Sequence, residues 1–265
     1  MSIKQFDRAE VLKLLENGYK EAILDYDLRG ADLSDAVLSG ANLSCTNLKG
    51  AKFTNSFLDG VVFKGANLTN AFFFGAVFDG ADFSGAFLMG ADLNNADLRG
   101  VKLTNAVLSG AILFWADLRG AFLTGANFSN ADLLCANLSN ANLSRTDLSG
   151  ASLRGANFSN ADLRGVNLSG VDLSGANLSN ADLNGANLSG ASIRGANLSG
   201  VDLRDANLRG ADLNDINLNG ADLNGADLRG ASLNGANLDF SCYPLWRGSL
   251  HLKANKRLAE KFKKR

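Results

Sequence analysis

Residues 26–50 read YDLRG, ADLSD, AVLSG, ANLSC and TNLKG, and the same five-residue pattern continues to ANLDF at 236–240. The stretch from 26 to 240 therefore holds 43 consecutive pentapeptides without an insertion or deletion. The third residue of each is Leu, Phe or Ile, and the first is nearly always Ala, relaxed to Val at 61, 101, 166, 171 and 201. A period this strict indicates a repeat architecture.

The five-residue period excludes the commoner repetitive folds. A helix needs apolar spacing near 3.6 residues, an alternating strand needs 2, and collagen needs glycine at every third position. A coil whose sides are each one pentapeptide does fit, with the large third residue filling the axis and the small first residue admitting close backbone approach. The expected core stack includes Leu28, Leu33, Phe53, Phe73, Leu113, Phe158 and Leu238.

Uninterrupted A(D/N)LXX repeats resemble those of the pentapeptide repeat proteins, over about four-fifths of this chain. The resemblance implies an all-β solenoid, a right-handed quadrilateral parallel β-helix with four pentapeptides in each coil. ASLRG at 151, ASIRG at 191 and ASLNG at 231 recur every 40 residues, which agrees with a 20-residue coil. The repeats would then make about 11 coils, stacked ~4.8 Å apart into a rod roughly 50 Å long.

We expect a cap at each end of the coil, because an open end exposes unpaired backbone and core. Residues 1–25 predict an N-terminal helical cap, with Asp7 as N-cap, Glu10 completing a capping box, and Phe6 and Val11 as a hydrophobic staple. Residues 241–265 predict a C-terminal cap with a short basic helix. This last segment is similar to the C-terminal extension of some bacterial and phage-like family members. The charge of the helix leaves open whether it only caps or also binds nucleic acid or an acidic partner.

A 20-residue coil aligns polar side chains in columns on the surface. One column is an uncharged amide ladder, made of Asn137, Asn157, Asn177, Asn197, Asn217 and Asn237. Another holds Asp162, Asp182, Asp202 and Asp222, with Arg164 and Arg204 beside it. Carboxylates ~5 Å apart repel one another, and the arginines would offset part of that repulsion. We interpret both columns as solvated faces.

Several outward positions that are normally polar become apolar in the first half of the repeats. These positions are Phe57, Val62, Phe72, Phe74, Val77, Phe87, Met89, Val107, Ile112, Phe114, Trp115, Phe122 and Leu134. In the 20-residue register, one face within four coils holds Phe72, Phe74, Ile112, Phe114, Trp115 and Leu134. Soluble monomers rarely expose contiguous apolar patches, and aromatic residues and Met are enriched at interfaces. We predict a candidate interaction patch for a protein partner or a second copy. The alternatives are that these apolar residues are scattered sequence drift without a binding role, or that the N-terminal segment covers them.

The sequence shows no catalytic or metal-binding constellation. His251 is the single histidine, so one chain cannot assemble a histidine metal cluster or a triad. Cys45, Cys135 and Cys242 lack metal-ligand spacing, and an odd number of scattered thiols indicates a reducing compartment. No apolar run approaches the ~20 residues of a membrane span, and the N-terminus lacks the apolar core of a signal peptide. We therefore expect a cytoplasmic, non-enzymatic protein with no cofactor and no membrane association.

Two functions remain open at this stage. The first is a rigid structural or protein-interaction scaffold. The second follows from the family resemblance, because some members bind DNA gyrase as DNA mimics. The whole chain has 26 Lys and Arg and 27 Asp and Glu, of which 12 and 6 lie outside residues 26–240. The repeats therefore carry 14 basic and 21 acidic residues.

Charge density decides between the two. Duplex DNA carries one charge per ~1.7 Å, so a mimic ~50 Å long needs about 30 negative charges. The net charge of −7 on the repeats falls well short of that number. The shortfall, together with the lack of loops that interrupt the coil, favours the scaffold over a gyrase-binding mimic. The mixed charges also disfavour direct binding of nucleic acid.

Overall fold

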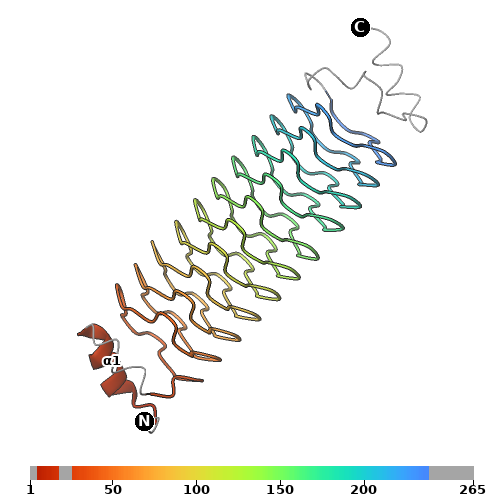
Figure 1. Ribbon diagram of the computed structural model, residues 1–265. Coiled ribbons are helices and arrows are strands. Elements are labelled where there is room, and N and C mark those ends of the chain that lie inside the picture. Colours follow the sequence, from red (N-terminus) through yellow and green to blue (C-terminus); the bar gives the residue numbers. More distant parts are fainter. Residues whose placement is uncertain (1–4, 18–25, 239–265) are drawn as a thin grey trace, which may run out of the picture.

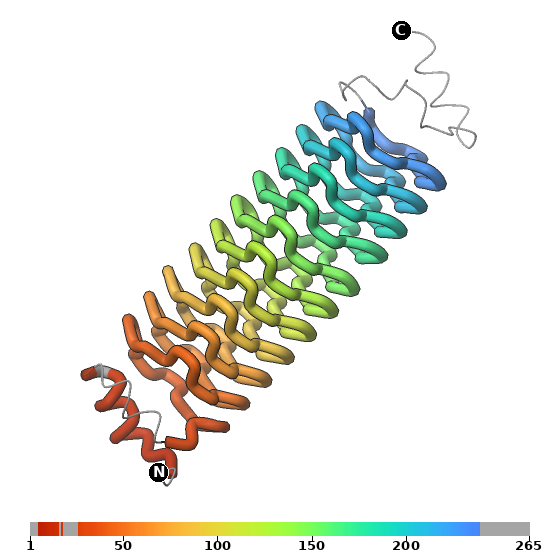
Figure 2. Tube along the Cα trace, in the orientation of Figure 1, coloured from red at the N-terminus to blue at the C-terminus, as the bar shows by residue number. Residues whose placement is uncertain are grey.

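The computed structural model describes residues 5–17 and 26–238. These residues form a straight rod with one helix, α1, at its N-terminal end (Figure 1). The chain winds along the rod as a stack of similar coils from residue 26 to residue 238 (Figure 2). Residues 1–4 and 18–25 of the expected N-terminal cap, and the cap and basic helix expected at 241–265, lie outside the described residues.

Parallel β-bridges set the register of the stack. Each bridge joins a residue to the one 20 positions later, from Asp32 and Lys52 at one end to Asn217 and Asn237 at the other. The bridging residue is the second of each pentapeptide, and the fourth and fifth residues form a turn. Since four pentapeptides complete one coil, the rod has four faces.

We name these faces in the order in which the chain crosses them. Face A holds the pentapeptides that begin at residues 31, 51, 71 and every 20 residues thereafter, and face B holds those that begin at 36, 56 and 76. Face C follows with those that begin at 41, 61 and 81, and face D with those that begin at 26, 46 and 66. A rung is one pentapeptide on one face, and the bridges join neighbouring rungs.

The first and third residues of the pentapeptides fill the interior. Leu28, Leu33, Phe53, Phe73, Leu113 and Phe158 are buried, and Leu238 is half-buried against the same core. Phenylalanine rings stack along the axis, with centroids 5.0 Å apart for Phe53 and Phe73 and 4.9 Å apart for Phe63 and Phe83. Burial of each large side chain stabilises the rod by roughly 1.5–3 kcal/mol.

The second residue of the motif closes the turn. The N–H groups of the first, second, third and fifth residues donate to backbone carbonyls, whereas that of the fourth residue has no backbone acceptor. In the pentapeptide 91–95 the carboxylate of Asp92 accepts this bond from the N–H of Asn94 at 3.1 Å. The same Asx-turn occurs in every described pentapeptide from 26 to 230 that has Asp or Asn second. Asp or Asn at the second position therefore stabilises the turn, a role that the sequence analysis did not identify.

The fifth residue of each pentapeptide has a left-handed backbone. Its φ lies between 54° and 74° throughout the described repeats, a region that suits Gly and tolerates Asn and Asp. The other residue types found there are Cys45, Trp115, Cys135 and Arg145. Such side chains cost roughly 1–2 kcal/mol in this conformation. The chain therefore places an indole at a corner of face A at a cost in backbone energy.

Helix α1, Arg8–Glu16, covers the N-terminal end of the core. The carboxylate of Asp7 accepts the N–H of Glu10 at 2.9 Å, as an N-cap does. Val11 is buried, and Phe6 packs half-buried against the same core. The guanidinium of Arg8 donates to carbonyls of the first rung of face A.

Candidate functional site

The six residues of the predicted patch share face A. Bridges join Phe72 to Asp92 and Asp92 to Ile112, so these three second-position residues form one column. Phe74 and Phe114 occupy the fourth position of the same rungs. Phe72 and Phe74 are 45% and 47% exposed, Ile112 and Trp115 are 39% and 58% exposed, and Phe114 and Leu134 are half-buried.

The patch has two apolar rungs separated by a polar one. The ring of Trp115 meets that of Phe114 edge-on, with centroids 5.7 Å apart, and both belong to the second apolar rung, residues 111–115. Asp92 and Asn94 lie between that rung and the rung of Phe72. The sequence analysis placed the residues on the correct face but treated the patch as continuous.

The described part of the N-terminal segment does not cover the patch. Helix α1 lies across the end of the rod rather than along its side (Figure 1). Its side-chain hydrogen bonds to the repeats reach the carbonyls of Asp32 and Ser34, at 3.2 and 2.6 Å from Arg8. Those carbonyls belong to the first rung of face A, two rungs before Phe72.

Apolar residues at the second position remove the acceptor that closes the turn. Among the described residues, no side chain accepts the N–H of Phe74, which follows Phe72. The N–H of Phe114, which follows Ile112, donates instead to Asn94 of the previous rung at 3.1 Å. A hydrogen bond of this kind contributes about 0.5–1.5 kcal/mol. Phe72 therefore costs its rung a stabilising hydrogen bond, whereas Ile112 leaves the N–H of Phe114 with an acceptor on the previous rung.

The remaining apolar departures form smaller clusters on the other faces. On face B, bridges join Val37, Phe57 and Val77, with Asp59 and Asp79 at the fourth positions. Val37 is 63% exposed, and the sequence analysis did not identify it. Faces C and D carry Phe122, and Phe87 with Met89, all exposed.

Amide ladders run along two faces of the second half. On face B the side-chain amide of each Asn donates to the Asn one rung before it, from Asn157 to Asn137 at 3.3 Å and onward to Asn237. A second ladder on face D joins Asn167 to Asp147 and continues to Asn207. The sequence analysis missed this second ladder, although the same 20-residue register contains it.

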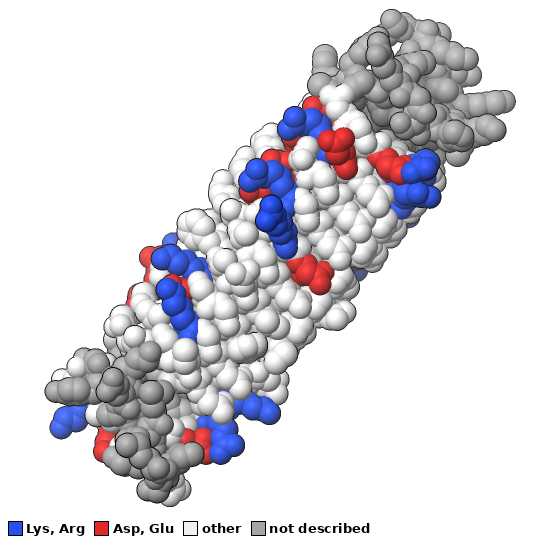
Figure 3. All heavy atoms as spheres, in the orientation of Figure 1, with Lys and Arg blue, Asp and Glu red and all other residues white. Residues whose placement is uncertain are grey.

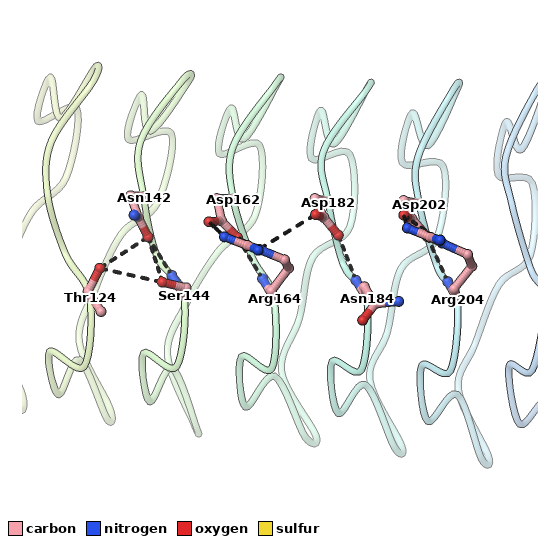
Figure 4. Close-up of polar contacts among 9 residues, drawn as sticks. All are labelled: Thr124, Asn142, Ser144, Asp162, Arg164, Asp182, Asn184, Asp202 and Arg204. Atoms are coloured by element: carbon pink, nitrogen blue, oxygen red, sulfur yellow. Dashed lines mark hydrogen bonds and ion pairs between the residues drawn. The ribbon is translucent and has the colours of Figure 1, made fainter.

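The aspartate column on face C is neutralised by arginine (Figure 4). Arg164 contacts Asp162 of its own rung at 2.6 Å and Asp182 of the next rung at 3.6 Å. The hydrogen bond from Arg164 lowers the pKa of Asp162 below its ordinary value. Arg204 pairs in the same way with Asp202. In the face shown in Figure 3, Lys and Arg lie beside Asp along the edges of the rod, with a broad uncharged area between.

No metal or membrane site is found in the part of the chain that the structure describes. Within residues 5–17 and 26–238, no three His, Cys, Asp or Glu side chains are arranged to hold a metal ion. In the same residues no helix is long and apolar enough to cross a bilayer. Cys45 and Cys135 are free thiols on opposite faces, and Cys242 and His251 lie outside the described residues.

Comparisons with known proteins identify the family. The profile described as pentapeptide repeats matches in overlapping segments that together cover residues 27–242. HetL from the cyanobacterium Nostoc sp. strain PCC 7120, a pentapeptide repeat protein involved in heterocyst differentiation regulation, is 34% identical over 89% of this chain and 94% of its own, with a TM-score of 0.38. Full-length QnrB1, a plasmid-mediated fluoroquinolone resistance protein, is 25% identical over 78% of this chain and 91% of its own, with a TM-score of 0.46.

A search of curated protein sequences gives no match. Proteins with pentapeptide repeats fold as right-handed quadrilateral β-helices and are generally non-enzymatic scaffolds. The 20-residue register of the bridges and the buried third residues agree with that fold. This chain belongs to the pentapeptide repeat family.

Proposed function

We propose that this protein is a non-enzymatic interaction scaffold, a rigid rod that docks a protein along face A. The contact surface consists of Phe72, Phe74, Ile112, Phe114, Trp115 and Leu134. One observation carries the proposal: exposed apolar residues stand at second positions where the repeat elsewhere uses Asp or Asn to close its turn. A structural role alone gives no reason to replace the acceptor of a rung's own turn with an exposed apolar side chain.

The backbone of Trp115 supports the same conclusion. Its φ of 59° is the conformation that Gly, Asn or Asp occupy at most other corners of the rod. The indole is 58% exposed, so burial in the rod does not explain its presence there. Strained residues in proteins cluster at functional sites, and Trp is enriched at the centres of interfaces.

The rod itself suits such a role because its geometry is fixed by its backbone. Hydrogen bonds join each coil to the coils before and after it along the whole described stretch. Six side chains on one face are therefore held at constant spacing without a partner. Preorganisation of this kind lowers the entropic cost of binding. The free thiols of Cys45 and Cys135 support a reducing, cytoplasmic setting.

The alternative of a DNA mimic that binds gyrase has weaker support. A mimic needs a dense row of unpaired negative charges, whereas Asp97, Asp117 and Asp162 each bind an arginine of their own rung. We expect gyrase supercoiling to be unchanged by a molar excess of this protein. Inhibition of supercoiling, or its protection from a fluoroquinolone, would instead support the alternative.

A pair of double variants tests the scaffold. Phe74→Asp with Phe114→Asp places two carboxylates on the patch, two rungs apart on face A. Ser159→Asp with Ser199→Asp is the matched control, because it adds the same charge at the same repeat position and spacing on face B. Circular dichroism and thermal unfolding first establish that both variants keep the fold.

The readout is the sedimentation of the tagged protein in extracts of its source cells. We expect wild type and the face B control to sediment as a complex, and the face A variant to sediment as a free rod. Identical sedimentation of all three proteins would contradict the proposed function.

A further inference from the structure

We infer that the occupant of face A is a second copy of this chain, packed antiparallel about a two-fold axis through the rung of Asp92. This inference rests on the proposed function and goes beyond it by naming the partner and its orientation. It rests on the order of side chains along face A. The rungs of one copy, read from the N-terminal end, complement those of a second copy read from the C-terminal end.

The apolar rungs lie at equal distances on either side of the polar rung. Phe72 is one coil before Asp92, and Ile112 is one coil after it. When two A faces meet with their rods antiparallel, Phe72 of one copy opposes Ile112 of the other, and Phe74 opposes Phe114. The contact is isologous, as a closed dimer requires.

Charges continue this complementarity beyond the apolar rungs. The next rung outward on one side carries Lys52, and the next on the other side carries Asp132. The antiparallel pairing places Lys52 of each copy opposite Asp132 of the other, so the ion pair occurs twice. Lys52 makes a long ion pair with Asp32, at 3.8 Å between Nζ and Oδ2, but its side chain is 54% exposed, so the ammonium can also be approached by a partner. One rung further out, Asp32 opposes the rung of Arg154.

The corner of the face shows the same fit in side-chain size. Trp115 occupies the fifth position of its rung, and the rung that opposes it has Gly75 in that position. The bulkiest corner residue of face A therefore meets a glycine, over which the side-chain amide of Asn55 lies with its Oδ1 2.8 Å from where a Cβ would stand. This match gives a reason for the strained backbone at Trp115.

The axis itself carries a like-charge contact. Asp92 of one copy opposes Asp92 of the other, and both are shorter than the phenylalanines on either side. Like charges facing each other across an interface weaken association. The arrangement therefore predicts a dimer held by its flanking rungs and opposed at its centre.

Other pairings satisfy fewer of these groups. Parallel rods would place each rung against itself, so Lys52 would face Thr54 rather than a carboxylate. Self-pairing of the face B strip about Phe57 would bring Asp59 against its own copy. Of these three pairings, only the antiparallel pairing of face A gives both apolar contact and opposite charges. An antiparallel pairing of face C about the midpoint of Asp82 and Lys102 also opposes these two charges, but the side chain of Asp82 is only 14% exposed and already pairs with Lys64 at 3.2 Å.

The size of the contact predicts its strength. The rungs from 52 to 132 extend roughly 20–25 Å at ~4.8 Å each, and a face three extended residues wide is about 10 Å across. The product is roughly 200–250 Å² of flat area per copy, which is below the usual size of specific interfaces. We therefore expect a weak dimer with a dissociation constant in the high micromolar range, so measurements need to extend to several hundred micromolar protein.

Two substitutions of the same kind on face A test the axis. Asp92→Asn removes the repulsion at the centre, whereas Asp132→Asn removes the two ion pairs with Lys52. Both keep an Oδ1 acceptor for the turn, which receives the N–H of Asn94 or Leu134 at 3.1 Å. In sedimentation equilibrium we expect Asp92→Asn to tighten the dimer and Asp132→Asn to weaken it, each by roughly threefold to tenfold. Changes of the same sign, or none, would overturn the proposed axis.

Cysteine cross-linking tests the orientation, with Cys45→Ser and Cys242→Ser as background. In the antiparallel dimer, position 55 of one copy opposes Cys135 of the other. Asn55→Cys should therefore give a covalent dimer with a short bis-maleimide. Within one rod these two positions are four coils, or roughly 19 Å, apart, too far for the linker. Neither Cys135 alone nor Asn55→Cys with Cys135→Ser should link, and a covalent dimer from either of them alone would contradict the antiparallel orientation.

The outcomes separate this inference from the proposed function. A monomer at all concentrations, together with a complex in extracts that the face A double variant abolishes, would overturn the second copy and retain the scaffold. A monomer whose sedimentation in extracts is unchanged by that variant would overturn both.

Discussion

From residue 136 to residue 237 the second residue of every pentapeptide is Asp, Asn or Ser, whereas between 57 and 134 it is often Phe, Val or Ile. The two regions share the same bridges, the same buried third residues and the same left-handed corners. Their main difference lies on the outside, where one carries amide ladders and the other carries exposed apolar side chains. The comparison separates the residues that build the rod from those available for binding.

The largest expected effect lies in the core, where the two regions should behave alike. Phe73→Ala removes a buried ring stacked on Phe53, and Leu173→Ala removes a buried side chain on the same face 100 residues later. We expect losses of about 3–5 and 2–5 kcal/mol in the free energy of unfolding. Chemical denaturation measures both. A loss below ~1 kcal/mol at either site would show that the coils there do not depend on their interior.

Substitutions at the second residue of the pentapeptide should affect the free energy of unfolding differently in the two regions. Asn177→Val removes the acceptor for the N–H of Ser179 and breaks the ladder bond to Asn157. We expect it to cost about 1–3 kcal/mol.

The matched change is Val77→Asn, on the same face 100 residues earlier. It should change stability by less than ~0.5 kcal/mol, because the N–H of Asp79 already donates to Asp59 at 3.1 Å. Equal and opposite effects at the two sites would contradict this account, since they would make the second position interchangeable along the rod.

The fifth position gives a smaller effect of opposite sign. Arg145→Gly relieves a left-handed backbone in the regular region, and we expect a gain of about 0.5–1 kcal/mol in unfolding free energy. Trp115→Gly relieves the same strain but loses the edge-on contact with Phe114, so its gain should be smaller. Thermal unfolding at neutral pH compares the two. A larger gain at Trp115 would show that its contact with Phe114 contributes nothing.

The smallest expected effect is the acid dependence of the Asp turns. Hydrogen bonds from Arg29 and Arg229 lower the pKa values of Asp27 and Asp227 to about 2. Because these pKa values lie below the ~3.9 of an unfolded chain, the stability they contribute is present above pH ~4 and is lost as the pH falls through about 2. We expect the unfolding midpoint to decrease between pH 4 and pH 2. A midpoint that is constant over that interval would show that these pairs do not stabilise the rod.

The sequence was sufficient to predict the period, the interior and the face on which the patch lies, because each depends only on counting in fives and twenties. The Asx-turn was missed because it depends on how Asp92 folds back onto the N–H of Asn94, which a column of letters does not show. The polar rung within the patch was not predicted, although Asp92 stands between Phe72 and Ile112 in the same 20-residue register. The occupant that we infer does not follow from the period; the inference rests on the order of side chains and charges on face A.

Photo-cross-linking in the source cells tests most directly whether the irregular region is the binding region. p-Benzoylphenylalanine in place of Phe74 or of Ser174 occupies the same repeat position on the same face, five coils apart. The account predicts a discrete protein adduct from position 74 and none above background from position 174. Equal yields at the two positions would contradict it.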